Sequence, residues 1–231
     1  MKISEFRRST RVLCLVTAAL FLLFAAFTLT VKLVDVDNVG PEGSAIGCAA
    51  INTAVHQTLG TSELWYEISD LFGLVALAVI GIFGLVGLIQ LIKRKSLLKV
   101  EPTILALGVF YVLVVACYVF FEVVVVNHRP VLMDGVLEAS YPSSHTMLVL
   151  TVMGSAIVVF RRSVASKTSK IIFACAADAI ILITLVGRTL SGVHWITDIV
   201  GGVLLSAALI TLYVTALRVI DELIAKRRAR A

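Results

Sequence analysis

The sequence predicts an all-α, polytopic membrane protein with six transmembrane helices. Hydrophobic residues make up 59% of the 231 residues and charged residues only 15%, whereas an ordinary soluble domain is about half apolar and a quarter charged. Apolar runs recur along the chain, and crossing a hydrocarbon core takes about 20 helical residues. These runs lack the alternation of outer-membrane strands, so they predict helices rather than a β-barrel.

Six spans are expected within a single membrane-embedded domain, 1–231. The fourth and fifth are short and are expected to extend into their polar flanks. The first follows several cations, as a secretory signal does, but it is too long for a signal core and lacks a clear cleavage site, so we expect it to be retained. The six expected spans are 12–31, 71–92, 104–126, 146–160, 171–186 and 195–217.

The positive charges predict the orientation. Of the 20 lysines and arginines, 17 fall at the two ends of the chain or in the second and fourth loops, and only Lys32, Arg129 and Arg188 fall elsewhere. Since such clusters stay on the cytoplasmic side, both termini are predicted to be cytoplasmic and loops one, three and five to face outward. Topology and anionic headgroups account for the net charge of +5, so no nucleic acid partner is needed.

The first outer loop, about 32–70, is the longest polar stretch. Its segment 47–59 is compatible with a helix on the membrane surface and equally with a plain connecting loop. Trp65 and Tyr66 are typical of an interfacial anchor before the second span. Cys48 is the only cysteine in an outward loop, so no disulfide within the outer loops is expected.

Chemically useful residues gather in loops three and five. His194 and Asp198 are four residues apart, so on a helix they share a face. A carboxylate bonded to one imidazole nitrogen fixes the tautomer and raises the basicity of the other, which makes a nucleophile. Simple capping is the alternative role for Asp198. Arg129 and Arg188 carry forked donors that fit phosphate, or else they snorkel to lipid headgroups. The segment 142–145 is typical of a helix start, which either binds an anion or only caps the helix.

These residues resemble a known signature. Arg129-Pro130, Pro142-Ser143-x-His145 and Arg188-x5-His194-x3-Asp198 are similar, in this order, to the three motifs of the type 2 phosphatidic acid phosphatase superfamily of membrane lipid phosphatases. The resemblance implies that His194 is the nucleophile, that Asp198 orients it and that His145 protonates the leaving oxygen. The candidate substrate-binding residues are Arg129, Pro142, Ser143, Ser144, Arg188, His128 and Glu122.

Two positions depart from the signature. Ser144 stands where the family usually has glycine, and Glu122 where it has a lysine seven residues before the arginine. Either Glu122 pairs with an arginine, or it selects a substrate with a cationic group, or activity is reduced; His128 is a substitute cation. Because seven residues are nearly two helical turns, Glu122 is expected to be buried in the bundle below Arg129 and paired with a cation of the site.

The resemblance implies an enzyme that hydrolyses a lipid phosphate or diphosphate at the outer membrane face through a phosphohistidine. Bacterial relatives act on undecaprenyl diphosphate, phosphatidylglycerol phosphate or phosphatidic acid. The resemblance also implies no metal and no cofactor, partners limited to the lipid phosphate substrate and membrane lipids, and a multi-pass location in a bacterial cytoplasmic membrane. A transporter is the rival class, but ionisable pairs and Gly or Pro breaks within spans are nearly absent. A degenerate lipid-phosphate-binding relative is the other alternative, favoured by Glu122.

Overall fold

The computed structural model describes residues 3–229, with side chains from residue 9 onward, and this part of the chain is almost entirely helical. Two short 3-10 turns, Pro41–Gly43 and Leu97–Lys99, lie between α-helices. All the α-helices except α2 are long and apolar enough to cross a membrane. The predicted all-α fold with six spans is therefore confirmed. The helices are α1 (Ile3–Leu33), α2 (Ala49–Leu59), α3 (Glu63–Arg94), α4 (Pro102–Val123), α5 (Ser144–Ser163), α6 (Lys167–Leu190) and α7 (Ile196–Arg228).

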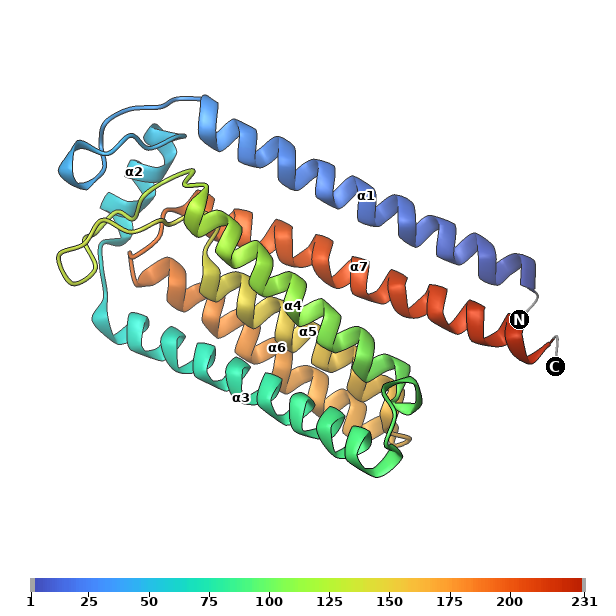
Figure 1. Ribbon diagram of the computed structural model, residues 1–231. Coiled ribbons are helices and arrows are strands. Elements are labelled where there is room, and N and C mark those ends of the chain that lie inside the picture. The colour runs from blue at the N-terminus through green and yellow to red at the C-terminus, as the bar shows by residue number, and fades with distance from the viewer. Residues whose placement is uncertain (1–2, 230–231) are drawn as a thin grey trace.

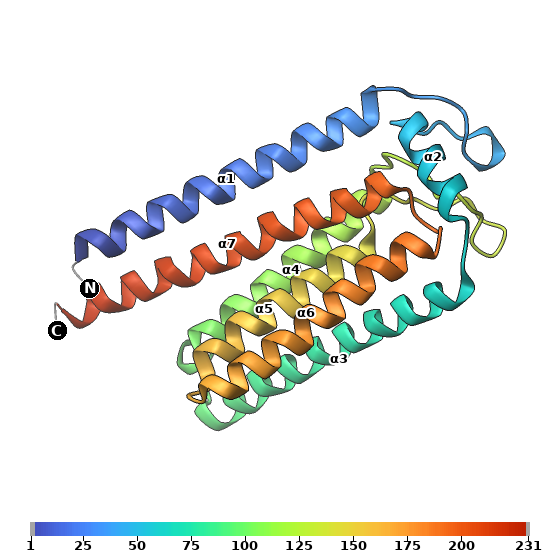
Figure 2. The same cartoon turned by 180° about the vertical axis from the view of Figure 1, so that it is seen from behind.

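Helix α5 lies at the centre of the bundle, packed against α3, α4, α6 and α7, whereas α1 lies along α7 at one side (Figures 1 and 2). Helix α5 is the most buried of the spans and the least apolar. Two of its buried hydroxyls are satisfied within the helix, since Thr151 donates to the carbonyl of Met147 and Ser155 to that of Val152. Internal hydrogen bonds thus explain why this short, polar-flanked run is a central span.

Several helix ends differ from the predicted spans. The fourth and fifth spans extend into their polar flanks as expected. The second begins earlier, because the hydroxyl of Ser62 caps α3 at the amide of Trp65. The third ends at Val123 rather than 126, because Val126 packs against the core from a non-helical segment. Trp195 lies just before α7, so the predicted start of the sixth span was one residue early.

The segment 47–59 contains helix α2, which decides between the two readings of the first outer loop in favour of a helix. Asn52 fixes α2 to the start of α7: its side-chain amide donates to the hydroxyl of Thr197, 2.9 Å away, and its carbonyl oxygen accepts from the Thr197 amide. Tyr66, predicted as an interfacial anchor, instead has its ring 5.3 Å from the guanidinium carbon of Arg188. Helix α2 and the first turn of α3 therefore contact the end of the bundle at which α6 meets α7.

The two ends of the bundle differ in what they carry. Both chain ends lie at one end, together with the α3–α4 and α5–α6 connections, while α2 and the 124–143 loop lie at the other (Figures 1 and 2). The cation-rich segments thus share one end, as the charge pattern predicted. Of those cations, Lys2 and Arg230 lie outside the described residues, as do the side chains of Arg7 and Arg8.

Two glycines of α7 allow the end of the 124–143 loop and the start of α5 to approach this helix closely. A Cβ atom at Gly201 would lie 2.6 Å from the ring of Tyr141, and one at Gly202 would lie 2.9 Å from the side chain of Thr146. Tyr141 is buried, and its hydroxyl lies 2.8 Å from that of Thr28 on α1. The absence of side chains at both glycines therefore lets the start of α5 rest directly on the first turns of α7.

Candidate active site

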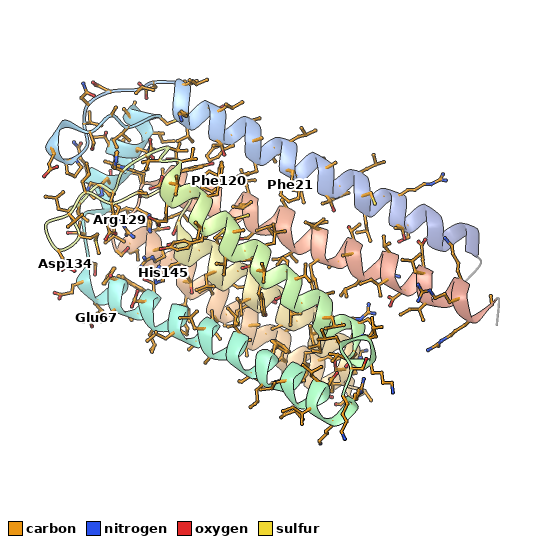
Figure 3. The ribbon with its side chains drawn as sticks, in the orientation of Figure 1. Phe21, Glu67, Phe120, Arg129, Asp134 and His145 are labelled. Atoms are coloured by element: carbon orange, nitrogen blue, oxygen red, sulfur yellow. The ribbon has the colours of Figure 1, made fainter. Side chains whose placement is uncertain are left out.

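Three segments meet at the end of the bundle that faces away from the chain ends: the 124–143 loop, the start of α5, and the α6–α7 junction. Figure 3 shows Arg129 and His145 at this end. The backbone amide of Ser143 donates to the carbonyl of Asp198 at 2.9 Å, and the indole of Trp195 donates to the carbonyl of His128 at 2.7 Å. Hydrogen bonds to main-chain carbonyls thus hold the three motif segments together.

His194 and Asp198 lie together, but not as predicted. His194 precedes α7 instead of lying on it, and its Nδ1 is 3.7 Å from the Asp198 carboxylate, beyond direct hydrogen bonding. The hydroxyl of Ser140 lies between them, 3.0 Å from His194 Nδ1 and donating to Asp198. The predicted direct pair is therefore corrected to a three-residue chain, because the turn before α7 moves His194 off the helix face.

This chain fixes the tautomer of His194. A serine hydroxyl has one hydrogen, and since Ser140 gives it to Asp198, its oxygen must accept the hydrogen of His194 Nδ1. Nε2 of His194 then presents a lone pair, and it is buried without a hydrogen-bond partner in the described structure. Burial, together with the positive charges of Arg129 and Arg188 and the nearby His145, lowers the pKa of His194 well below its ordinary value. The arrangement presents a neutral imidazole nitrogen, the form that attacks an electrophile.

Asp198 also caps α7. Its carboxylate accepts a hydrogen bond from the Trp195 amide at 2.9 Å, while its second oxygen has no partner among the described residues. The side chain is completely buried. The sequence left two alternative roles for Asp198, capping of α7 and orientation of His194. The same carboxylate is placed to do both.

Both candidate arginines are withdrawn from solvent, which excludes snorkelling. Arg188 is 1% exposed, and its guanidinium donates to the hydroxyl of Ser69 and lies 3.0 Å from Nδ1 of His145. The side chain of Arg129 is 11% exposed and forms an ion pair with Glu138 at 3.0 Å. Arg129 Nη1 and Arg188 Nε are buried without a hydrogen-bond partner in the described structure, as is Arg129 Nε, whose contact with Glu138 is an ion pair only. The two guanidinium groups are thus held in place with donor capacity left over.

The 142–145 segment starts α5 as predicted. Ser143 is fully buried and caps the helix by accepting from the amide of Thr146. Pro142 is buried beside it, whereas Ser144 and His145 are partly exposed. An anion at this position would meet the free amides of the first helical turn.

Asp70 joins the site although the sequence did not single it out. It lies on α3, and its carboxylate is 2.8 Å from Nε2 of His145. A charged residue at the start of an apolar span costs free energy, and this cost is the feature of the sequence that could have pointed to a role for Asp70. Ser140 was also missed, since a serine in a loop carries no comparable signal.

Glu122 does not lie where it was expected. It is exposed rather than buried, and no ion pair with a cation is found for it among the described residues. The helical geometry that placed it below Arg129 fails because α4 ends at Val123. Arg129 pairs with Glu138 instead. Glu122 nonetheless lines a small pocket that also reaches Ser140 and His194.

His128 contributes its backbone carbonyl to Trp195, and its side chain is partly exposed. Within the described residues, no group of three or more His, Cys, Asp or Glu side chains is arranged as metal ligands would be. All four cysteines are free thiols. The side chains that converge at this end are thus two imidazoles, two guanidiniums and the carboxylates that orient them.

Comparisons with known proteins give two matches. A family model described as the PAP2 superfamily matches residues 104–220, which is 117 of the 231 residues. Among solved structures, the crystal structure of "the first transmembrane PAP2 type phosphatidylglycerolphosphate phosphatase from Bacillus subtilis" matches with a TM-score of 0.56 and 18% identity, over 85% of this chain and 93% of that one. At that identity the likeness concerns the fold. No curated protein matches.

The hydrogen-bond chain through Ser140 predicts a stability difference. Ser140→Ala leaves the Nδ1 hydrogen of His194 unpaired in a buried site and removes one of the two hydrogen bonds to Oδ2 of Asp198, so the free energy of unfolding should fall by about 1–3 kcal/mol. Ser206→Ala is the matched control, because that buried hydroxyl donates only to helix carbonyls, and its loss should cost under about 1 kcal/mol. Denaturant unfolding in detergent measures both. Equal losses would show that Ser140 is an ordinary buried hydroxyl.

Proposed function

The chain belongs to the PAP2 superfamily, and we propose from this premise that it is an integral membrane lipid phosphatase that works through a phosphohistidine on His194. The observation that carries the proposal is Nε2 of His194, a buried and unpartnered nitrogen near two guanidinium groups that retain free donors. Nucleophile and phosphate-binding cations are the two components that phosphoryl transfer requires of a protein.

The proposed reaction has two steps. In the first, Nε2 of His194 forms a bond to phosphorus while the bond from phosphorus to the leaving oxygen breaks, and His145 gives that oxygen a proton. Arg129 and Arg188 hold the phosphoryl oxygens, as planar guanidinium forks do. In the second step, a water oxygen attacks phosphorus and gives a proton to His145, and the nitrogen–phosphorus bond breaks. Inorganic phosphate and the original imidazole result.

A cavity beside the site supports the proposal that the substrate is a lipid. A cavity of about 330 Å³ lies between α3, α4 and α5, with Asp70, Ser144 and His145 among its lining residues. Its other walls are largely apolar and include Leu74 and Leu77, whose side chains are exposed on the surface of a membrane-spanning helix. A phosphate at His145 would therefore have room for an apolar chain beside it.

The substrate class we propose is a lipid phosphate monoester or diphosphate, with undecaprenyl diphosphate, phosphatidylglycerol phosphate and phosphatidic acid as the members to assay. Ser143, Ser144 and Pro142 would form the phosphate loop at the start of α5, and Glu122 and His128 would act at the rim. Glu122 on the pocket wall favours one rival, a degenerate binding protein, because a carboxylate repels phosphate. Measured phosphate release separates the two.

The first prediction concerns the two histidines. His194→Ala removes the nucleophile, so phosphate release should fall by at least about a thousandfold while elution from size-exclusion chromatography in detergent is unchanged. His145→Ala removes the proposed acid, whose contribution is typically about 10²–10⁴-fold. The loss of rate in His145→Ala should be smaller for a diphosphate, because its leaving group needs less protonation. Phosphate release by His194→Ala at the normal rate would refute the mechanism.

The second prediction concerns the face of the membrane. We propose a bacterial cytoplasmic membrane with the site outward, based on the grouping of cations at the opposite end. In a background with Cys48 replaced by alanine, Leu132→Cys in the 124–143 loop should react with a membrane-impermeant maleimide in intact cells. Ser166→Cys, in the α5–α6 connection, should react only after lysis. The reverse pattern would place the site in the cytoplasm.

A further inference from the structure

One contact in the site has no counterpart in the three motifs: the carboxylate of Asp70 with His145. Asp70 belongs to α3, outside the residues that the family model matches. Its Oδ1 is 2.8 Å from Nε2 of His145, while Nδ1 of the same ring lies 3.0 Å from a guanidinium nitrogen of Arg188. The imidazole is thus held at both nitrogens, by a carboxylate on one side and an arginine on the other.

These two contacts determine where the hydrogens lie. An arginine can only donate, so Nδ1 of His145 must present its lone pair to Arg188. Nε2 then carries the hydrogen and donates it to Asp70. In this arrangement the ring is neutral and has no proton to give on the side of Arg188.

Binding of a phosphate would change this arrangement. Phosphate oxygens are charged acceptors, so they bind a guanidinium more strongly than a neutral imidazole nitrogen does. Arg188 would move its donor from Nδ1 to the phosphate, and Nδ1 would then take up a proton from solvent. The resulting imidazolium keeps its Nε2 hydrogen on Asp70, and the negative charge of Asp70 stabilises the positive ring.

We propose that Asp70 is the positioning residue of His145: it fixes the ring through Nε2, assigns proton donation to Nδ1, and stabilises the charged ring once a phosphate has taken Arg188. This inference rests on the proposed function. It also assigns a role to α3, which would supply the carboxylate for the acid while α7 supplies the carboxylate for the nucleophile.

The test compares Asp70→Asn with Asp70→Ala, using Glu67→Gln as the matched control. Glu67 is exposed and lies one turn earlier on the same helix (Figure 3). With a lipid phosphate monoester, Asp70→Asn should lower kcat at least about tenfold with KM within about twofold. With a lipid diphosphate of the same chain, kcat should fall less than about threefold, because the leaving phosphate needs little protonation. Asp70→Ala should show the same substrate dependence, and Glu67→Gln should match the wild type.

A second readout is independent of turnover. Nitrogen-15 NMR of histidine-labelled protein in detergent, with His145→Ala for assignment, should show a protonated Nε2 and a bare Nδ1 in His145. Asp70→Ala should keep that tautomer, because Arg188 still donates to Nδ1. With inorganic phosphate bound, the wild type should show a His145 ring protonated at both nitrogens, and Asp70→Ala should reach that state only at lower pH, because the charged ring has lost its carboxylate partner. Equal loss of kcat on both substrates, or the same protonation of His145 in phosphate-bound wild type and Asp70→Ala, would overturn the role of Asp70. Absence of turnover by the wild type would overturn the proposed function instead, and the NMR measurement with inorganic phosphate would still decide whether Asp70 stabilises the charged ring.

Discussion

The buried carboxylate of Asp198 is the group on which the arrangement of the site depends. It accepts hydrogen bonds from the hydroxyl of Ser140 and the amide of Trp195, and the backbone carbonyl of the same residue accepts from the amide of Ser143. A carboxylate without such donors would be costly to bury. The side-chain and main-chain contacts of Asp198 therefore join the 124–143 loop, the start of α5 and the start of α7, and those of the carboxylate set the tautomer of His194.

A second carboxylate, that of Asp70, contacts the other histidine of the site. Asp198 acts through the hydroxyl of Ser140 on a ring that is neutral before it attacks, whereas Asp70 contacts its ring directly and suits a ring that must carry a proton to give away. Each guanidinium is already engaged, Arg129 by Glu138 and Arg188 by His145. A phosphate that takes a donor from Arg188 replaces its contact with His145, so substrate binding and rearrangement of the proton donor are coupled.

The sequence predicted the spans and the residues that meet at the site, because apolar length and motif order are local properties. It could not predict the spatial relations that depend on helix ends. His194 and Asp198 were expected on one helix face, but α7 begins after His194, which makes room for Ser140. Glu122 was expected below Arg129, but α4 ends one residue after it. Asp70 lies 75 residues from His145, and no spacing rule relates two residues brought together only by the packing of α3 on α5.

In the proposed mechanism, Nε2 of His194 is the atom that takes the phosphoryl group. The most direct test is to stop the enzyme during turnover and locate the phosphorus by ³¹P NMR of ¹⁵N-histidine-labelled protein. We expect an acid-labile phosphoenzyme with phosphorus coupled to Nε2 of His194, and we expect none in His194→Ala. Phosphorus on Nδ1, on His145, or on no histidine while phosphate release proceeds would contradict it.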